Sequence, residues 1–202
     1  MQRIIYPEDK LYPKNLEKTT LYCKGKIIWN NPTLAIIGSR DCSPQIENKI
    51  LKIIESLPNN IVIVSGLAKG VDSIAHLSAI KLNRKTIAVL PCGIDMVYPK
   101  ENIPLSKLIL EKGGLLVSEY KGKQRPSKKS FVLRNRIITG LSSVVLVAEA
   151  KIKSGTMHAV NFAKKQEKPI YAIPGSEGSD FLISKGSFNA SNLPLAFKND
   201  KN

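Results

Sequence analysis

The residues best suited to chemistry lie in a basic segment, residues 120–148, that contains no aspartate or glutamate. A run of one charge sign is electrostatically unfavourable unless water solvates it or it meets a polyanion. Guanidinium groups bind phosphate through two parallel hydrogen bonds, which lysine cannot copy. The basic segment and a Gly-Ser-Arg triplet upstream therefore indicate binding to a phosphate backbone. Together they hold four of the six arginines of the chain: Arg40, Arg125, Arg134 and Arg136.

One helix face within the basic segment combines an aromatic ring with polar groups. Phe131, Arg134 and Asn135 are three and four residues apart, a spacing that places side chains on the same side of a helix. A ring beside guanidinium and amide groups suits an unstacked base and its phosphate. The alternative is structural: Phe131 belongs to the core, and Arg134 pairs with an acid such as Glu149 or Asp72. The sequence leaves both interpretations open.

Loops rich in Gly, Ser and Thr follow several of the expected strands. Glycine lets a ligand approach the backbone closely, and free amides at a helix start attract anions. In an open α/β sheet such loops meet at the carboxyl edge, where ligands bind. Neither G-x-G-x-x-G nor a P-loop occurs, so dinucleotide and triphosphate binding lose their main support. Any one loop could be only a tight turn, so the argument rests on all five: 38–40, 65–72, 91–95, 154–156 and 174–175.

The elements that must position these loops alternate between strands and helices. Six short runs are rich in β-branched residues and nearly free of charge, which is typical of strands buried on both faces of a parallel sheet. Helical spacing lies between them, and Ser43 and Ser130 are suitable N-caps. Repeated βα units predict an α/β protein with an extended Rossmann-like fold: a doubly wound, mostly parallel sheet with helices on both faces. The expected strands are 34–37, 61–64, 87–90, 115–117, 144–147 and 170–173; the expected helices are 44–57, 75–82, 105–109, 133–141 and 157–165, with a short last element at 180–184.

We divide the chain into three parts. Residues 1–33 carry turn signals and few periodic features, so we expect an N-terminal extension that packs on the main domain. Residues 34–190 form the Rossmann-like domain, which holds the basic segment and is expected to bind nucleic acid. Residues 191–202 are predicted to form a polar, frayed C-terminal tail.

Composition narrows the class of protein. A formal net charge of +15 on 202 residues favours a nucleic-acid or anionic-membrane partner, although scattered lysines could simply make the surface basic. The three cysteines are widely spaced and contain no Cys-x-x-Cys pair, which argues against a disulfide framework and favours a cytoplasmic protein. The two histidines lack the spacing of metal ligands, so we expect no zinc site. No apolar run approaches 18 residues, so we expect no contact with a membrane. We also expect no cofactor.

Motifs along almost the whole chain, in this order, resemble those of the DNA-processing protein A family, also called DprA or Smf. The resemblance covers residues 5–190, and the combination of motifs is highly specific. The matching residues are Tyr12-Pro13, 21–25, 35–40, 65–72 with His76, 93–95, Tyr98-Pro99, Asn102, Ser118-Glu119, 131–136, 140–142, 154–156 and 172–175.

This resemblance implies a non-enzymatic protein that binds single-stranded DNA, protects incoming DNA and helps to load the RecA recombinase during natural transformation. It also implies a homodimer formed through the Rossmann domains. Many relatives carry an additional N-terminal helical domain and a C-terminal winged-helix-like domain; this chain has room for neither, so we expect a minimal member or a shortened chain. The implied DNA-binding residues are Gly38, Ser39, Arg40, Lys128, Phe131, Arg134, Asn135, Ser154, Gly155 and Thr156.

Two other functions remain open from the residues. Lonely-guy-like phosphoribohydrolases hydrolyse nucleoside monophosphates on a related fold, but their glutamate has no counterpart in residues 154–159. Without it, no evident group stabilises or protonates the glycosidic centre. Asp72, Asp95 and His76 could supply acid–base chemistry, although we expect Asp72 to cap a helix and His76 to be structural. A nucleotide-sensing module that binds a small phosphorylated ligand is the third possibility.

Overall fold

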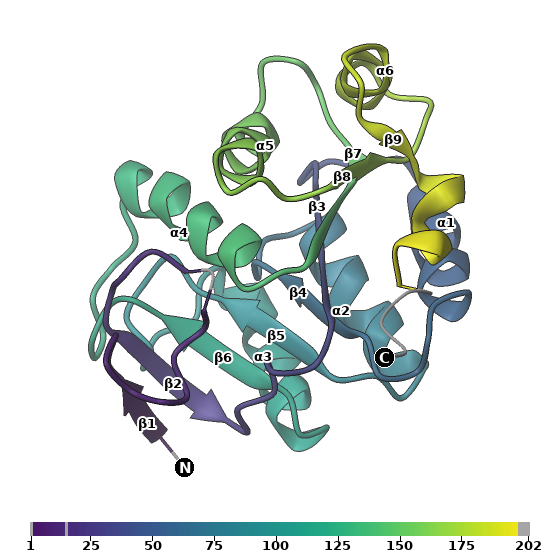
Figure 1. The fold of residues 1–202 in the computed structure, drawn as a ribbon. Helices are drawn as coiled ribbons and strands as arrows, with labels where there is room; N and C mark the ends of the chain where they lie inside the picture. Colours follow the sequence, from purple (N-terminus) through teal and green to yellow (C-terminus); the bar gives the residue numbers. More distant parts are fainter. Residues whose placement is uncertain (1, 15, 198–202) are drawn as a thin grey trace.

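The computed structural model describes residues 2–14 and 16–197, and within them a single nine-stranded sheet forms the centre of the molecule (Figure 1). Strands β3 to β8 are parallel to one another and coincide with the six strands predicted from the sequence. In spatial order the strands are β1 (Gln2–Ile5), β2 (Leu21–Gly25), β6 (Leu115–Ser118), β5 (Thr86–Val89), β4 (Val62–Ser65), β3 (Thr33–Gly38), β7 (Val144–Glu149), β8 (Ile170–Ala172) and β9 (Phe188–Asn189).

Helices cover both faces of this sheet, which confirms the doubly wound Rossmann-like fold. One face packs against α4 (Lys128–Gly140), α5 (Gly155–Lys165) and α6 (Glu177–Ser184). The other packs against α1 (Gln45–Glu55), α2 (Val71–Lys81), α3 (Ile103–Glu111) and the 3-10 helix η2 (Ala190–Phe197); a second 3-10 turn, η1 (Lys100–Asn102), precedes α3.

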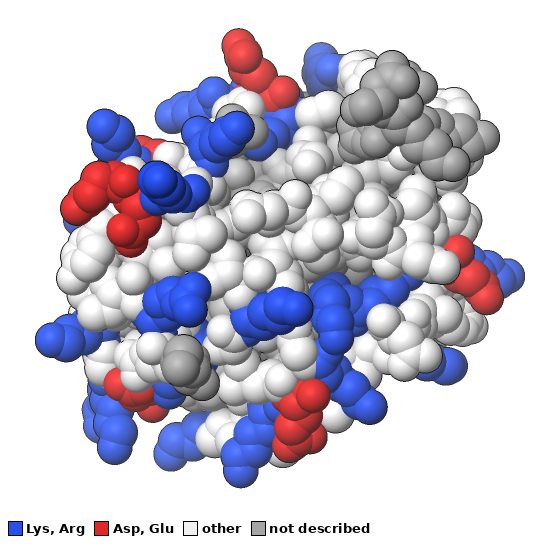
Figure 2. All heavy atoms as spheres, turned by 60° about the horizontal axis from the view of Figure 1, so that its bottom comes forward, with Lys and Arg blue, Asp and Glu red and all other residues white. Residues whose placement is uncertain are grey.

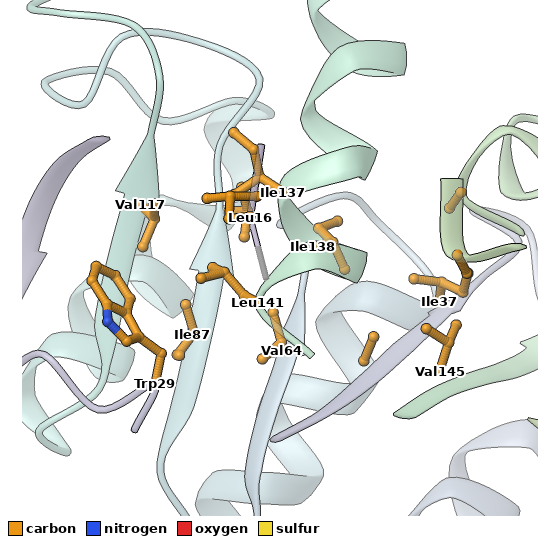
Figure 3. Packing of buried hydrophobic residues seen from close by; sticks show 14 of the residues in the cluster. Leu16, Trp29, Ile37, Val64, Ile87, Val117, Ile137, Ile138, Leu141 and Val145 are labelled. Carbon is orange, nitrogen blue, oxygen red and sulfur yellow. The ribbon is translucent and has the colours of Figure 1, made fainter. Parts of the chain in front are cut away.

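The C-terminal half of α4 anchors that helix on the sheet. Ile137, Ile138 and Leu141 point towards the strands in Figure 3, and all three are buried. Trp29 lies in the same cluster and donates a 2.9 Å hydrogen bond from Nε1 to the Leu11 carbonyl. Because this end of α4 is fixed in the core, its first turns are held rigidly over the carboxyl ends of the parallel strands.

Two strands of the N-terminal extension, β1 and β2, extend the sheet at its edge. Strand β2 pairs antiparallel with β6, and β1 pairs antiparallel with β2. Leu21 and Cys23 are fully buried, whereas Tyr22 and Lys24 are partly exposed. This alternation is the two-residue period of a half-buried strand. Only five residues carry that period, so the sequence showed turn signals more clearly than the strand.

The chain end differs from the expected polar tail. Residues 190–197 form η2, and Leu193 and Phe197 are buried against Ile173 and Tyr171 in the cluster that also contains α1. The expectation of a frayed tail is therefore wrong for residues 191–197, because two apolar side chains among polar neighbours reach a hydrophobic groove. Residues 198–202 lie outside the described residues.

We expect Leu193→Ala to lower the free energy of unfolding by about 2–5 kcal/mol, since it leaves a cavity under η2. Leu195, in the same 3-10 helix, is 57% exposed and provides the matched control. Leu195→Ala should change stability by no more than about 0.5 kcal/mol. Urea unfolding of both variants measures the difference; equal stability of the two would show that η2 does not contribute to the core.

Candidate nucleic-acid interface

A cavity opens where the winding of the sheet changes direction. Strand β3 lies between β4 and β7 in the sheet. After β3 the chain continues to β4 on one side, and after β7 it continues to β8 on the other side. In doubly wound sheets this switch point leaves a crevice between the two loops, which is where ligands bind. Here the crevice is a cavity of about 460 Å³, bordered by the loops after β3 and β7 and by the first turns of α4.

Nine of the ten residues predicted for the site line this one cavity. They come from three separate segments: Gly38, Ser39 and Arg40; Phe131, Arg134 and Asn135; and Ser154, Gly155 and Thr156. Lys128, the tenth, is exposed at the first residue of α4 and does not line the cavity. Arg40 and Arg134 therefore share a cleft, although they are not equivalent within it.

Arg40 is an exposed side chain on a firmly held backbone. The preceding Ser39 amide donates to the Glu149 carbonyl at 2.8 Å, and the Val71 amide donates to the Ser39 carbonyl at 3.0 Å. Gly70 has φ +75°, and a side chain there would collide with the carbonyls of Ser39 and Arg40. The guanidinium carbon lies 5.1 Å from the Phe131 ring centroid, within cation–π range.

Phe131 is half-buried at the mouth of the cavity, so it is not part of the core. Its position depends on where α4 begins. Ser127 is the N-cap: its hydroxyl accepts from the Ser130 amide at 3.1 Å, and the Ser130 hydroxyl accepts from the Ser127 amide at 2.8 Å. The prediction of Ser130 as the N-cap is wrong by three residues, since both serines belong to one capping box.

Ser43 is likewise not an N-cap. Pro44 already has helical torsion angles, and the Ser43 hydroxyl donates to Glu149 Oε2 at 2.7 Å. Glu149 is thereby held by the start of α1. It is not the partner of Arg134.

Arg134 forms the floor of the cavity and is only 5% exposed. Its Nη1 donates to the Val89 carbonyl at 2.6 Å, and its Nη2 lies 4.0 Å from Asp72 Oδ2. Burial lowers the pKa of Arg134, and the nearby Asp72 carboxylate opposes that shift by favouring the charged form. The alternative in which Arg134 pairs with an acid is thus correct, whereas the alternative in which Phe131 belongs to the core is wrong. Arg134 supplies a fixed positive charge at the floor of the cavity and does not extend into it.

Asp72 is the centre of a small buried polar network. It accepts from the Ser65 hydroxyl at 3.0 Å and from the Ala68 amide at 3.2 Å, in the loop before α2. The prediction that Asp72 caps a helix is wrong, because Gly70 is the N-cap of α2 and no described side chain bonds the first amides of this helix. Gly66 passes so close to Asp72 and Arg134 that a Cβ there would overlap both side chains. The glycine in the loop after β4 therefore makes room for the ion pair.

His76 is fully buried beside this network. Its Nδ1 lies 2.6 Å from Thr86 Oγ1 and its Nε2 lies 2.5 Å from the Gly66 carbonyl. Burial lowers the pKa of His76, which favours the neutral ring. Both nitrogens are occupied by protein groups and do not face the cavity, so the histidine is structural, as predicted.

The basic segment divides between two roles. Arg136 points away from the cavity: its Nη2 lies 3.1 Å from Glu119 Oε2 and its Nε lies 3.5 Å from Glu17 Oε2. It therefore ties α4 to the N-terminal extension and to the end of β6. Sequence reasoning missed Lys151 and His158, which line the cavity from the loop after β7 and from α5. A basic residue in a loop directly after a buried strand was the available signal for Lys151.

Fold and cavity together define an α/β protein with a basic, aromatic-bearing crevice at the switch point of its sheet. Residues 3–190 match the family model of DNA recombination-mediator protein A. The chain therefore belongs to the DprA/Smf family.

Individual relatives agree with this assignment. DNA processing protein DprA of Streptococcus pneumoniae is 40% identical over 191 residues, which is 89% of this chain and 67% of that protein. Protein Smf of Escherichia coli is 36% identical over 197 residues, which is 91% of this chain and 53% of that protein. The chain thus spans about half to two thirds of the length of these relatives.

Solved structures show the same fold. The X-ray structure of DNA processing protein A from S. pneumoniae matches with a TM-score of 0.91 and 36% identity, covering 97% of this chain and 74% of that one. DNA processing protein A from Helicobacter pylori, whose structure is described as giving insights into a unique single-stranded DNA binding mode, matches with a TM-score of 0.82 and 34% identity. That match covers 96% of this chain and 94% of the other.

Proposed function

We propose that this chain binds single-stranded DNA in the crevice at the switch point and acts, without catalysis, as a recombination mediator. The observation that carries the proposal is the exposed Arg40 guanidinium over the half-buried Phe131 ring, at the mouth of a cavity floored by Arg134. A base can stack on such a ring while its phosphate meets the guanidinium.

The start of α5 adds a second group of donors. No side chain among the described residues caps this helix, and the Ser154 hydroxyl donates instead to the Lys151 carbonyl at 2.7 Å. The first amides of α5 are thus available to an anion, and the space beside Gly155 is open. Phosphate oxygens of a strand lying in the cavity would meet these amides opposite Arg40.

A single strand fits this geometry better than a duplex. The ring of Phe131 and the floor of the cavity are reached only by a base that has left its stack, and leaving a duplex costs pairing and stacking energy. The relative from H. pylori, described as a single-stranded DNA binder, supports the same choice.

Protection of incoming DNA, loading of RecA during natural transformation and a homodimeric state belong to the proposal through family membership. They concern proteins that are longer than this chain. Among residues 2–14 and 16–197, no helix is both long and apolar enough to cross a membrane. The cytoplasmic location expected from cysteine usage stays a prediction.

Positive charge is also present far from the cavity. Figure 2, in which the bottom of Figure 1 is turned forward, shows Lys and Arg side chains spread over this face beside a large uncharged area, and Asp and Glu in small groups. A diffuse basic surface of this kind binds single and double strands alike through their phosphates. The test of the proposal must therefore separate the cavity from the general charge.

We expect single-stranded oligonucleotides to bind at least about tenfold more tightly than duplexes of the same length. The logarithm of the association constant should fall with the logarithm of salt concentration by about 0.7 for each phosphate neutralised on a single strand. Fluorescence anisotropy of labelled oligonucleotides across a salt series measures both quantities. Equal affinity for the two forms would indicate the diffuse surface.

The same titration separates the other candidate functions. Tight, saturable binding of a mononucleotide with a shallow salt dependence would indicate a nucleotide-sensing module. Release of free base from a nucleoside monophosphate above the rate of a blank would indicate a phosphoribohydrolase. The proposal predicts weak mononucleotide binding and no release of base.

A further inference from the structure

A second, larger cavity adjoins the first. It has a volume of about 1010 Å³ and shares Arg40, Phe131 and Arg134 with the cavity at the switch point. From this shared border it runs beneath the loop after β5 and the segment that leads into α4. Apolar side chains and rings form part of its walls: Pro91, Met96, Tyr98, Pro99 and Pro126.

Tyr98 is the outstanding side chain of this second cavity. It is 41% exposed and lines the cavity, so part of its ring is accessible to a ligand there. Its ring contacts Phe131 edge-on, with centroids 5.6 Å apart and an interplanar angle of 69°. Two aromatic rings at the common border of two cavities therefore offer faces in different directions.

The charge of the second cavity is positive. Five basic side chains line it, Arg40, Lys69, Lys100, Arg125 and Arg134, against the two carboxylates of Asp41 and Glu101. Glu101 is already occupied by Lys69 at 2.8 Å. Arg125 takes part in none of the salt bridges found in the described part of the chain, so its exposed guanidinium is available to an anion.

We propose that the second cavity is a further base-binding subsite for the same single strand, with Tyr98 as its stacking platform. Arg125 and Lys100 neutralise the phosphates on this side of Phe131, and the proline walls exclude water from the base. Since stacked bases follow the rings beneath them, the 69° angle between the two rings requires the strand to turn as it passes from one cavity to the next. This subsite rests on the proposed function and extends it.

The length of the oligonucleotide tests this subsite. We expect the affinity of Tyr98→Leu for oligo-dT to be reduced increasingly with length, reaching about 5- to 150-fold on oligomers of about ten nucleotides, the range for loss of one stacked base. On oligomers of about two nucleotides, which the first cavity alone can hold, the loss should be several-fold smaller. Tyr98→Phe keeps the ring and should bind like the parent at every length.

Tyr6 supplies the matched control, because it is 46% exposed and lines neither cavity. Tyr6→Leu should match the parent at all lengths. An equal loss for Tyr98→Leu at every length would mean that Tyr98 only supports Phe131, and no loss at any length would leave the groove to another ligand such as a peptide; both outcomes overturn the subsite. Failure of the proposed function is distinguishable, since the parent itself would then not prefer single strands.

Discussion

Arg40→Ala should weaken the binding of single-stranded DNA about 10- to 150-fold and leave the free energy of unfolding unchanged. A hydrogen bond to a charged group contributes about 1.5–3 kcal/mol, which corresponds to that range. The side chain is exposed and takes part in none of the salt bridges of the described residues, so its loss leaves no buried group unsatisfied. Anisotropy titration measures the affinity, and urea unfolding measures the stability.

Arg3 provides a charge-matched control for Arg40. It is an exposed arginine on β1, at the edge of the sheet, and it does not line the cavity. Arg3→Ala removes the same formal charge, yet its effect at physiological salt should be small because distant exposed charges are screened. If the two variants lose affinity equally, general charge and not the crevice binds the DNA.

Asp72→Ala should lower the free energy of unfolding by about 3–5 kcal/mol, because it leaves the buried Arg134 guanidinium without its counter-ion. It also removes the acceptor of the Ala68 amide, whereas the Ser65 hydroxyl keeps the Ile36 carbonyl at 2.6 Å. The charge of Asp72 and its hydrogen bonds act on the same three segments: the loop after β4, the start of α2 and the middle of α4. Urea or thermal unfolding of the variant measures the loss.

Two companion variants show which interaction is responsible. Asp41 is exposed in the loop after β3, and Asp41→Ala should change stability by no more than about 0.5 kcal/mol. Combining Asp72→Ala with Arg134→Met removes the uncompensated charge and should recover part of the loss. A decrease below about 1 kcal/mol for Asp72→Ala alone would contradict the role of the ion pair.

The two arginines of the cavity thus have different functions in the proposal. Arg40 is exposed and contacts the strand directly, whereas Arg134 is buried and fixed by Val89 and Asp72. A fixed charge beneath the crevice attracts phosphate without losing side-chain entropy on binding. Substitution of Arg134 would therefore affect both stability and affinity, and its effect on binding is harder to interpret than that of Arg40.

Local sequence determined the six central parallel strands, most helices and the loops of the crevice, but not the edge strands β1, β2 and β9. Neighbouring residues specify strands such as 144–147 and glycine-containing turns such as 38–40. The order of the βα units then determines at which edge of the parallel sheet the loops meet. The family motifs then predicted which of these loops bind DNA. Each strand, turn and motif used in these inferences is a pattern of a few neighbouring residues.

Only the tertiary structure decided what each side chain contacts. Arg134 and Arg136 are two residues apart and look alike in the sequence, but they project in different directions from α4, one to Asp72 and the other to Glu17 and Glu119. Their partners are remote in the sequence, so no local pattern could assign them. For the same reason the burial of Leu193 and the meeting of Tyr98 with Phe131 became evident only in the folded molecule.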